Sequence, residues 1–338
     1  MRKGIEHWLN QVWYGRKKPP FWLVALVPLY RFARKTDRRW KIARQPEELR
    51  QVPIIVVGNL TVGGSGKTPL VVHLCNSLQQ AGFKPGVVSR GYGRKTGALT
   101  RVGKNSSPAD VGDEPVLIAR RTGVPVMVAN DRCAAALSLL KEDVDVVIAD
   151  DGLQHYRLPR TLEICVVDGA REFGNGLELP AGPLRESVER LKSVDYVVVN
   201  GGNEAASAGQ RTINMQIVPG LLRSLDDRLS WRISQFTGCQ VNAIAGIGNP
   251  QRFFQSLQQA GLKTHDYAFP DHHVFTDQDF SAMKPDLPII MTEKDAVKCA
   301  ALQLDNAWYL SVDAMLPTWW DAEIAEKVSV TRRAAGHS

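Results

Sequence analysis

A short glycine-rich segment holds the residues whose types and spacing point most directly to chemistry. It ends in Gly66-Lys67-Thr68, follows the apolar run 52–58 and precedes the helical pattern of residues 69–78. A turn between a strand and a helix directs backbone N–H groups toward one point, and glycines leave room there for phosphate oxygens. Lys67 would reach the outer phosphates, and Thr68 would hold Mg²⁺. The segment predicts a nucleoside triphosphate site formed by Thr61, Val62, Gly63, Gly64, Ser65, Gly66, Lys67 and Thr68.

Two acids, Asp150 and Asp151, follow the apolar run 144–149. An acid at the end of a buried strand beside a phosphate-binding loop holds Mg²⁺ directly or through water. Either acid alone could instead be a turn or helix-capping residue. Two adjacent carboxylates repel each other unless a cation is near, so the pair favours a metal or catalytic role.

Two further segments carry acids or histidines, and their spacing leaves a structural interpretation open. Asp113 stands at the start of a predicted helix, where capping alone could explain it. Asp271 and His272 follow a predicted strand, and a carboxylate beside an imidazole fixes its tautomer for proton transfer, although both could be loop residues. The run 291–298 has the pattern of a strand end that leads into a capped helix.

Apolar strands alternate with helical segments from residue 51 onward, which predicts an α/β fold. We expect a P-loop NTPase-like, mostly parallel sheet flanked by helices, with a second, smaller α/β domain. Ligands of such sheets bind at the carboxyl ends of the strands. The expected strands of the first unit are 53–58, 86–89, 125–128, 144–149, 162–167 and 194–199, and its expected helices are 67–81, 113–121, 131–141 and 185–191.

Composition divides the chain into five segments. A small-residue stretch after Asn200 marks the end of the first unit, and a new apolar strand at 241–246 opens the second. The predicted segments are a basic N-terminal membrane-interface segment (1–50), a P-loop kinase core (51–205), connector strands (206–235), a smaller α/β domain (236–330) and a frayed tail (331–338).

The positive charge of the chain is concentrated at its N-terminus. Residues 1–50 hold thirteen Lys and Arg against four acids, a local charge of +9, while the whole chain carries +7 and the remainder about −2. Within this segment the apolar run 21–30 is too short to span a bilayer, which needs about 20 residues. Tryptophans around one apolar block favour a segment lying on an anionic membrane surface. A helix packed on the domain and a nucleic-acid-binding arm are the alternatives.

The five cysteines stand far apart, at positions 75, 133, 165, 239 and 299. None of them forms a pair at metal-ligand or redox spacing, so we expect reduced and mostly buried thiols. This usage is typical of a cytosolic protein.

Taken together, these segments resemble the tetraacyldisaccharide 4'-kinase family, the lipid A 4'-kinases of Gram-negative bacteria. The resemblance extends over nearly the whole chain and rests on the order and combination of its motifs. In that family a threonine occupies the motif position where a glycine is usual, as Thr61 does here. The matching segments are Trp13-Tyr14, Val57–Pro69, Ser89–Arg94, Gly112–Pro115, Asp150–His155, Leu179–Glu186, Phe269–His273 and Met291–Asp295.

The resemblance implies a reaction that depends on ATP and Mg²⁺. The γ-phosphate would pass to the 4'-hydroxyl of an acylated glucosamine disaccharide 1-phosphate, giving lipid IVA at the cytoplasmic face of the inner membrane, where the enzyme is peripheral. It implies neither a nucleic acid nor a protein partner. By the same resemblance, Asp113 would be the general base assisted by His272 paired with Asp271, metal binding would fall to Thr68, Asp150, Asp151 and Glu186, and acceptor contacts to Arg90, Gln154, His155 and Arg185.

Because Asp271 and His272 lie in the predicted second unit, we expect the site to form when the two units close over the nucleotide. A membrane-associated P-loop ATPase switch, which phosphorylates no acceptor, is the main alternative. A nucleic-acid-dependent ATPase is a third possibility, and the slight acidity of residues 51–338 argues against it.

Overall fold

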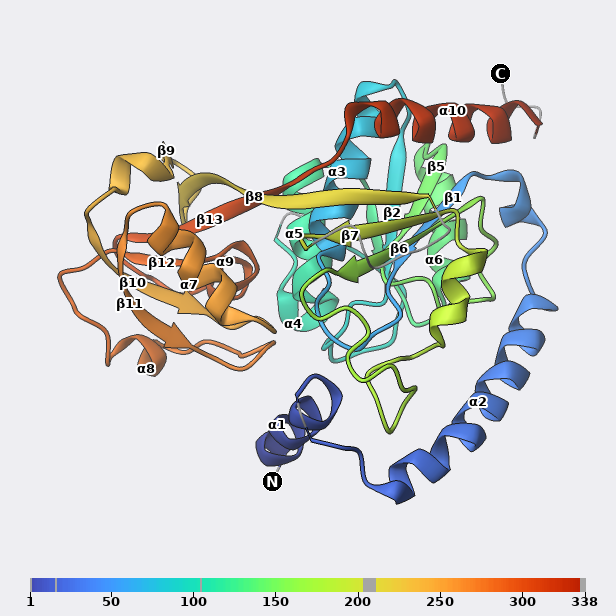
Figure 1. Cartoon of the computed structure of the whole chain (residues 1–338). Coiled ribbons are helices and arrows are strands. Elements are labelled where there is room, and N and C mark those ends of the chain that lie inside the picture. Colours follow the sequence, from blue (N-terminus) through green and yellow to red (C-terminus); the bar gives the residue numbers. More distant parts are fainter. Residues whose placement is uncertain (1, 16, 104, 203–210, 335–338) are drawn as a thin grey trace.

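The computed structural model describes residues 2–15, 17–103, 105–202 and 211–334. In this part of the chain, one continuous sheet of 13 strands runs through two lobes that lie side by side (Figure 1). The strand order is β11-β10-β12-β13-β8-β7-β6-β1-β5-β2-β4-β3, and β9 pairs with β8 beside this path. The mostly parallel sheet and its flanking helices confirm the predicted α/β class.

The large lobe contains β1 to β7, and its described strand pairs are parallel except for β3 with β4. The strands are Ile54–Gly58 (β1), Pro85–Ser89 (β2), Thr100–Arg101 (β3), Val126–Val128 (β4), Val146–Ala149 (β5), Leu162–Asp168 (β6) and Tyr196–Asn200 (β7). The helices are Lys67–Gln80 (α3), Pro108–Val111 (α4), Asp113–Thr122 (α5) and Arg132–Leu139 (α6). Where a helix was predicted over 185–191, the chain forms a 3₁₀ helix at Val188–Ser193.

The small lobe continues the same sheet through one long strand. β8 (Thr212–Ser224) is parallel to β7 at its start and antiparallel to β13 along the rest of its length. The other strands are Ser230–Arg232 (β9), Gln240–Ala245 (β10), Lys263–Ala268 (β11), Ile289–Thr292 (β12) and Ala307–Met315 (β13). The helices are Pro250–Gln259 (α7), Asp277–Phe280 (α8) and Glu293–Cys299 (α9). The predicted connector thus includes β8 and β9, while its residues 206–210 lie outside the described residues.

Two hydrophobic cores hold β1 in place from opposite faces. Ile55 and Val57 join the core that includes α3 and α5, whereas Ile54 and Val56 join the core beneath α6. Side chains alternate between the faces of a strand, so a strand that is apolar throughout must be covered by helices on both faces. All residues of β1 are buried. The strand therefore gives the phosphate-binding loop that follows it a fixed starting point.

The C-terminal helix α10 (Thr318–Ala334) returns to the large lobe, although most of it falls in the range predicted for the smaller domain. Trp320 is fully buried in the core that includes β1 and α3, and its ring meets Tyr196 edge to face at 5.8 Å between centroids. The helix extends to Ala334 and so includes the first residues of the predicted tail, whose residues 335–338 lie outside the described part.

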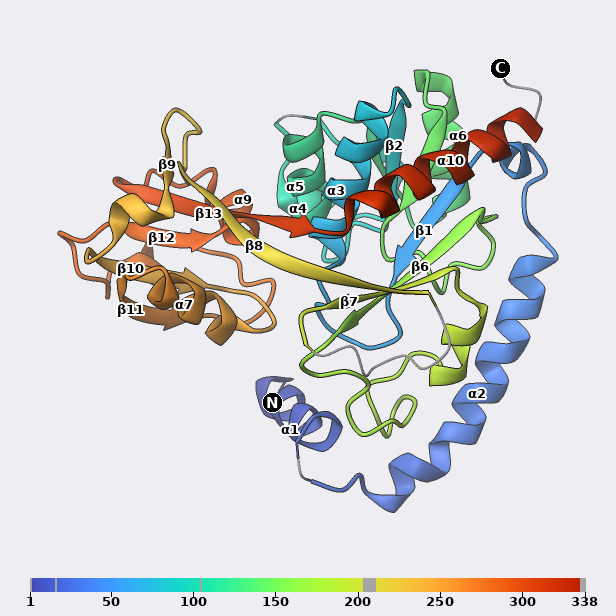
Figure 2. The same cartoon turned by 45° about the horizontal axis from the view of Figure 1, so that its top comes forward.

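Two N-terminal helices lie outside the large lobe, α1 (Arg2–Trp13) and α2 (Phe21–Ile42) (Figure 2). Leu23 and Val27 of α2 pack against the lobe beside Ala181. No helix in the described residues is long and apolar enough to cross a bilayer. The large apolar side chains that α2 exposes are Phe21, Trp22, Val24, Leu26, Leu29, Phe32, Trp40 and Ile42.

We predict that Trp320→Ala lowers the free energy of unfolding by about 3–5 kcal/mol, because it leaves a cavity where a buried indole joins α10 to the core. Its neighbour Trp319 is 56% exposed. Trp319→Ala, the matched control, should change stability by no more than about 0.5 kcal/mol. Urea denaturation of both variants measures the difference, and equal losses would show that α10 does not depend on this contact.

Candidate functional site

The phosphate-binding loop lies between β1 and α3, as the sequence predicts. Gly63 and Gly66 have φ values of +108° and +94°, in the region that favours glycine. A Cβ on Gly66 would lie 2.4 Å from Nδ2 of Asn200, so this position also lacks space for a side chain. Lys67 is the first residue of α3, and Thr68 follows it at the helix N-terminus. A phosphate at this helix end would meet backbone N–H groups and the positive end of the helix dipole.

Four side chains donate hydrogen bonds to carbonyl oxygens of this loop, three of them from distant parts of the chain. These contacts fix the loop carbonyls, so that backbone N–H groups at the start of α3 are the groups suited to an anion. The donors are Tyr14 Oη to Val62 O (3.0 Å), Asn59 Nδ2 to Gly63 O (3.2 Å), Arg171 Nη2 to Gly64 O and Asn200 Nδ2 to Ser65 O (3.1 Å).

Asp151 connects the loop to the end of β5. Its carboxylate forms an ion pair with Lys67 Nζ at 3.4 Å and another with Arg185 Nη1 at 3.0 Å. Burial opposes the ionisation of Asp151, but the charges of Lys67 and Arg185 outweigh this effect and hold the pKa of Asp151 below its usual range. Asp151 is therefore a carboxylate at neutral pH, beside the lysine that was predicted to reach the outer phosphates.

Asp150 is almost completely buried next to it. Its Oδ2 accepts a hydrogen bond from Ser89 Oγ at 3.0 Å, while its Oδ1 has no partner among the described residues. Burial and the nearby charges of Glu114 and Asp151 raise the pKa of Asp150 to about 7. A buried carboxylate oxygen without a donor, beside a second carboxylate, is an arrangement that a divalent cation would satisfy.

Asp113 and His272 meet across the boundary between the lobes. Asp113 begins α5 in the large lobe, His272 follows β11 in the small lobe, and Asp113 Oδ2 lies 3.1 Å from His272 Nδ1. Burial opposes ionisation of Asp113, but the hydrogen bond with His272 and the charge of Lys294 outweigh it and lower the pKa of Asp113 to about 2. The same hydrogen bond raises the pKa of His272 above its ordinary value. The pair is suited to taking up a proton on the imidazole.

The His272 ring lies near two carboxylates, of which Asp113 is the closer. Asp271, the expected partner, has its Oδ1 at an ion-pair distance of 3.9 Å from Nε2 and also accepts a hydrogen bond from the backbone N of His272 at 3.0 Å. His272 has a φ of +58°, and its ring packs at a tilted angle on Tyr92, with 5.1 Å between the ring centroids. The contact with Asp113, from the other lobe, could not be predicted from the sequence neighbours of His272.

Glu186 is fully buried and already surrounded by donors. Its carboxylate accepts hydrogen bonds from Arg34 Nη1 (2.6 Å), Tyr156 Oη (2.5 Å) and Gln154 Nε2 (3.1 Å). Gln154 also donates to Asn59 O at 3.1 Å. These contacts are suited to fixing α2 and the loop before α3 relative to each other, which favours a positioning role for Glu186.

The remaining predicted acceptor residues lie near an arginine that the sequence analysis did not single out. Arg132 of α6 is buried, its Nη2 donates to Asp151 O at 3.0 Å, and its Nε has no partner among the described residues. Burial and the charge of Arg132 lower the pKa of His155 to about 3, so this imidazole is neutral. Arg90 is exposed at the end of β2. The spacing of apolar residues along the predicted helix does not indicate that Arg132 is buried.

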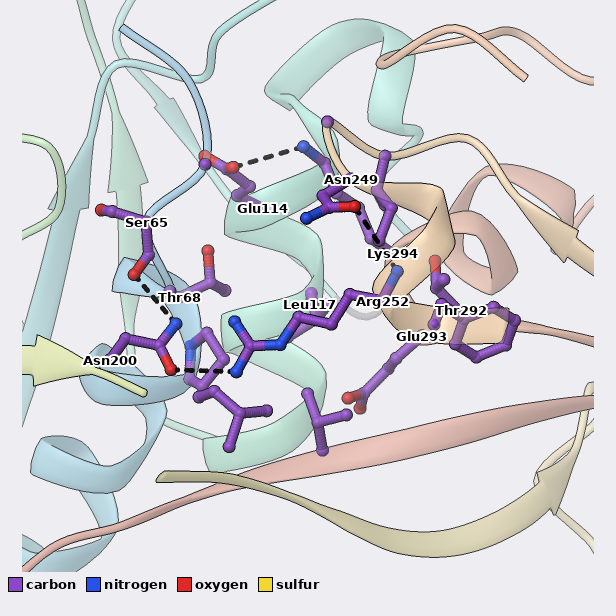
Figure 3. A pocket seen from close by; sticks show the side chains of 18 of the residues that line it. Ser65, Thr68, Glu114, Leu117, Asn200, Asn249, Arg252, Thr292, Glu293 and Lys294 are labelled. Atoms are coloured by element: carbon purple, nitrogen blue, oxygen red, sulfur yellow. Dashed lines mark hydrogen bonds and ion pairs between the residues drawn. The ribbon is translucent and has the colours of Figure 1, made fainter. Parts of the chain in front are cut away.

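A pocket of about 310 Å³ opens between the lobes, beside the phosphate-binding loop (Figure 3). On one side of it, Arg252 of α7 donates to Asn200 Oδ1 at 3.4 Å, which connects the small lobe to the residue that holds Ser65 O. Lys294 enters from α9. The sequence alone indicates no role for Asn200, Arg252 or Lys294, because their proximity to the loop depends on how the lobes pack. Apolar lining comes from Pro69, Val72, Leu117, Ile217, Phe253, Leu310 and Val312.

Comparisons with known proteins agree with this geometry. The family model described as tetraacyldisaccharide-1-P 4'-kinase matches residues 20–329. The chain is 46% identical over 330 residues to the tetraacyldisaccharide 4'-kinase of Shewanella denitrificans, covering 96% of this chain and 98% of the relative. It is 46% identical over 321 residues to that of Legionella pneumophila, covering 94% and 97%.

Among solved structures, the chain is similar to LpxK from Aquifex aeolicus, whose crystal structure was determined in complex with ATP. The similarity covers 91% of this chain and 98% of that chain, with a TM-score of 0.73 and 27% sequence identity. A family match over most of the chain, full-length relatives and the same fold all lead to one assignment. The chain belongs to the tetraacyldisaccharide-1-P 4'-kinase family.

Proposed function

We propose that this protein transfers the γ-phosphate of ATP to the 4'-hydroxyl of a tetraacylated glucosamine disaccharide 1-phosphate, a step of lipid A synthesis. Family membership supports this reaction. The structural observation that supports it most directly is the contact of 3.1 Å between Asp113 and His272, two side chains suited to accepting a proton, near the loop before α3. A P-loop ATPase switch phosphorylates no acceptor, so it needs no pair of side chains to take a proton from a sugar hydroxyl.

The triphosphate lies on the loop between Gly63 and Thr68, with Lys67 at its outer phosphates. The nucleoside occupies the neighbouring pocket, where Leu117 and Phe253 offer apolar surface. Arg252 then approaches the nucleotide from the small lobe. This arrangement requires both lobes to be in place before transfer, which is the expected use of a site assembled by closure.

Mg²⁺ fits the acidic corner beside the loop. Asp150 offers a buried carboxylate oxygen that has no partner in the part of the chain that the structure describes, and Asp151 and Thr68 flank Lys67. We assign the metal to these three residues and a positioning role to Glu186, whose carboxylate already accepts several hydrogen bonds. When bound, the ion supplies positive charge that neutralises the phosphoryl oxygens.

The acceptor hydroxyl is a poor nucleophile at neutral pH, so its proton must leave as the new bond forms. The 4'-oxygen forms a bond to the γ-phosphorus, the bond from that phosphorus to the bridging oxygen breaks, and ADP departs with the electron pair. The released proton goes to the Asp113–His272 pair. With Nδ1–H of His272 donating to Asp113, Nε2 is the imidazole atom free to accept it.

The acceptor carries acyl chains, and α2 is suited to meet it at a bilayer surface. Apolar side chains such as Leu29 and Phe32 are 65% and 70% exposed, and the N-terminal segment is strongly basic. Apolar burial and attraction to anionic lipids add at such a surface. We propose peripheral attachment of α2 to the cytoplasmic face of the inner membrane, with Arg90, His155 and Arg185 near the bound headgroup.

We predict that Asp113→Asn lowers the turnover number by about 10²–10⁴-fold, because the pair loses the carboxylate that stabilises the protonated imidazole. ATP binding should be unchanged, since the loop is intact. Transfer of labelled phosphate from ATP to the acceptor lipid measures turnover, and calorimetry measures ATP binding. Asp110→Asn, on exposed α4, is the control and should retain activity. Unchanged turnover of Asp113→Asn would exclude the proposed base.

Release of free phosphate without any transfer by the wild type would favour the ATPase switch.

We predict that Asp151→Asn raises the Mg²⁺ concentration needed for half-maximal transfer by about 10- to 100-fold. The variant removes a charge that lies 3.4 Å from Lys67 at the carboxyl end of β5. Asp143→Asn changes an exposed acid at the opposite end of this strand and serves as control. A Mg²⁺ titration of the transfer rate distinguishes them, and matching curves would remove Asp151 from the metal site.

We predict that Leu29→Ser combined with Phe32→Ser weakens binding to anionic vesicles by roughly 10-fold per side chain, since each one buries apolar surface at the bilayer. Vesicle sedimentation measures the effect. Leu229→Ser combined with Trp231→Ser removes comparably exposed side chains from the small lobe and should leave binding unchanged. If both double variants bind like the wild type, α2 is not the attachment site.

A further inference from the structure

Lys294 places one ammonium group among three carboxylates at the lobe boundary. It is the second residue of α9 in the small lobe, and its side chain is 19% exposed. Its Nζ lies 3.4 Å from Glu114 Oε1, 3.4 Å from Asp271 Oδ1 and 3.7 Å from Asp113 Oδ2. Glu114 and Asp113 belong to the large lobe, so this one side chain connects the small lobe to the start of α5.

The capping of α9 does not explain Lys294. Thr292 is the N-cap, and its Oγ1 accepts a hydrogen bond from Asp295 N at 3.1 Å. The carboxylate of Asp295 accepts from Thr292 Oγ1 at 2.6 Å and from Gly246 N at 2.8 Å. A cation in the first turn of a helix is unfavourable, because it faces the positive end of the helix dipole. The three carboxylates offset this cost, which indicates that the position of Lys294 serves them rather than the helix.

We propose that Lys294 is a positioning residue that keeps the Asp113–His272 pair in its proton-accepting state, with the carboxylate ionised and the imidazole neutral. This proposal rests on the proposed function. Lys294 acts by its charge and its place at the lobe boundary, through its contacts with the carboxylates around the pair. Lobe closure and base activation therefore depend on the same side chain.

The charges around the pair support this role. Asp113 faces Lys294 and His272, with Glu114 beside it in the chain and Lys298 one turn further along α9. Around His272, the acids Asp113 and Asp271 favour the imidazolium, whereas burial and the charge of Lys294 oppose it. Removing the lysine charge raises the pKa of both members of the pair. At a given pH, more of the enzyme then already carries the proton that the pair must accept.

A second connection between the lobes offers a matched control. Arg121 of α5 forms an ion pair with Glu293 at 2.9 Å and with Asp313 of β13. It thus joins the same helices as Lys294, α5 and α9, without an ion pair to Asp113. If Lys294 served only to hold the lobes together, Arg121→Met and Lys294→Met would affect the pH dependence of kcat/KM in the same way.

The test is the pH dependence of kcat/KM for phosphate transfer to the acceptor lipid, measured for the wild type and three variants. Lys294→Met should move the acidic limb upward by about half to one pH unit. Lys294→Arg, which keeps the charge, should leave the limb in place. Arg121→Met should change kcat or KM but leave the limb where the wild type has it. Lys294→Gln, neutral but able to donate hydrogen bonds, repeats the test if Lys294→Met does not fold.

NMR titration of the His272 imidazole without nucleotide gives a readout independent of catalysis. The pKa of His272 should rise in Lys294→Met and stay unchanged in Arg121→Met. An unmoved limb together with an unmoved imidazole pKa overturns the role of Lys294 while the kinase assignment stands. A wild type that transfers no phosphate overturns the proposed function instead, and the imidazole titration then still decides whether Lys294 controls the pair.

Discussion

The ion pair between Lys67 and Asp151 is the contact on which the rest of the site depends. It exists because β1 and β5 are adjacent and parallel, with Val56 opposite Ala149, so that both strands end at the same edge of the sheet and β1 continues two residues beyond β5. One strand continues into the phosphate-binding loop and the other into the two acids. The buried strands leave little freedom at these ends. The proposed phosphate cradle and the proposed metal site therefore lie beside each other as a consequence of strand register.

The small lobe supplies His272, the second member of the proposed proton-accepting pair. β8 is long enough to pair with β7 at one end and with β13 at the other, so the small lobe is attached through the sheet itself. Contacts between the two lobes include those of His272 with Asp113, Lys294 with Glu114, Arg252 with Asn200 and Glu293 with Arg121. We propose that the proton acceptor is complete only while His272 contacts Asp113, so that closure of the lobes is coupled to the chemistry.

The parts predicted correctly from sequence are those encoded by neighbouring residues. An apolar run, a glycine-rich turn and a helical pattern fix the loop before α3, and the acids after β5 follow the same logic. The parts that were missed depend on packing between distant segments. Arg132 is buried by segments distant in sequence rather than by its own helical pattern, and α10 packs on the large lobe although it follows the small one. His272 contacts Asp113 because the two lobes pack together.

The central claim is that the loop and the two acids act as one site for a metal-bound triphosphate. The most direct measurement is a crystal structure with a non-hydrolysable ATP analogue and Mn²⁺ in place of Mg²⁺, which locates the metal by anomalous scattering. The account predicts the phosphates on the Gly63–Thr68 loop and the metal peak beside Thr68, with Asp150 or Asp151 in its coordination shell directly or through water. A nucleotide bound away from this loop, or a metal peak remote from both acids, would contradict it.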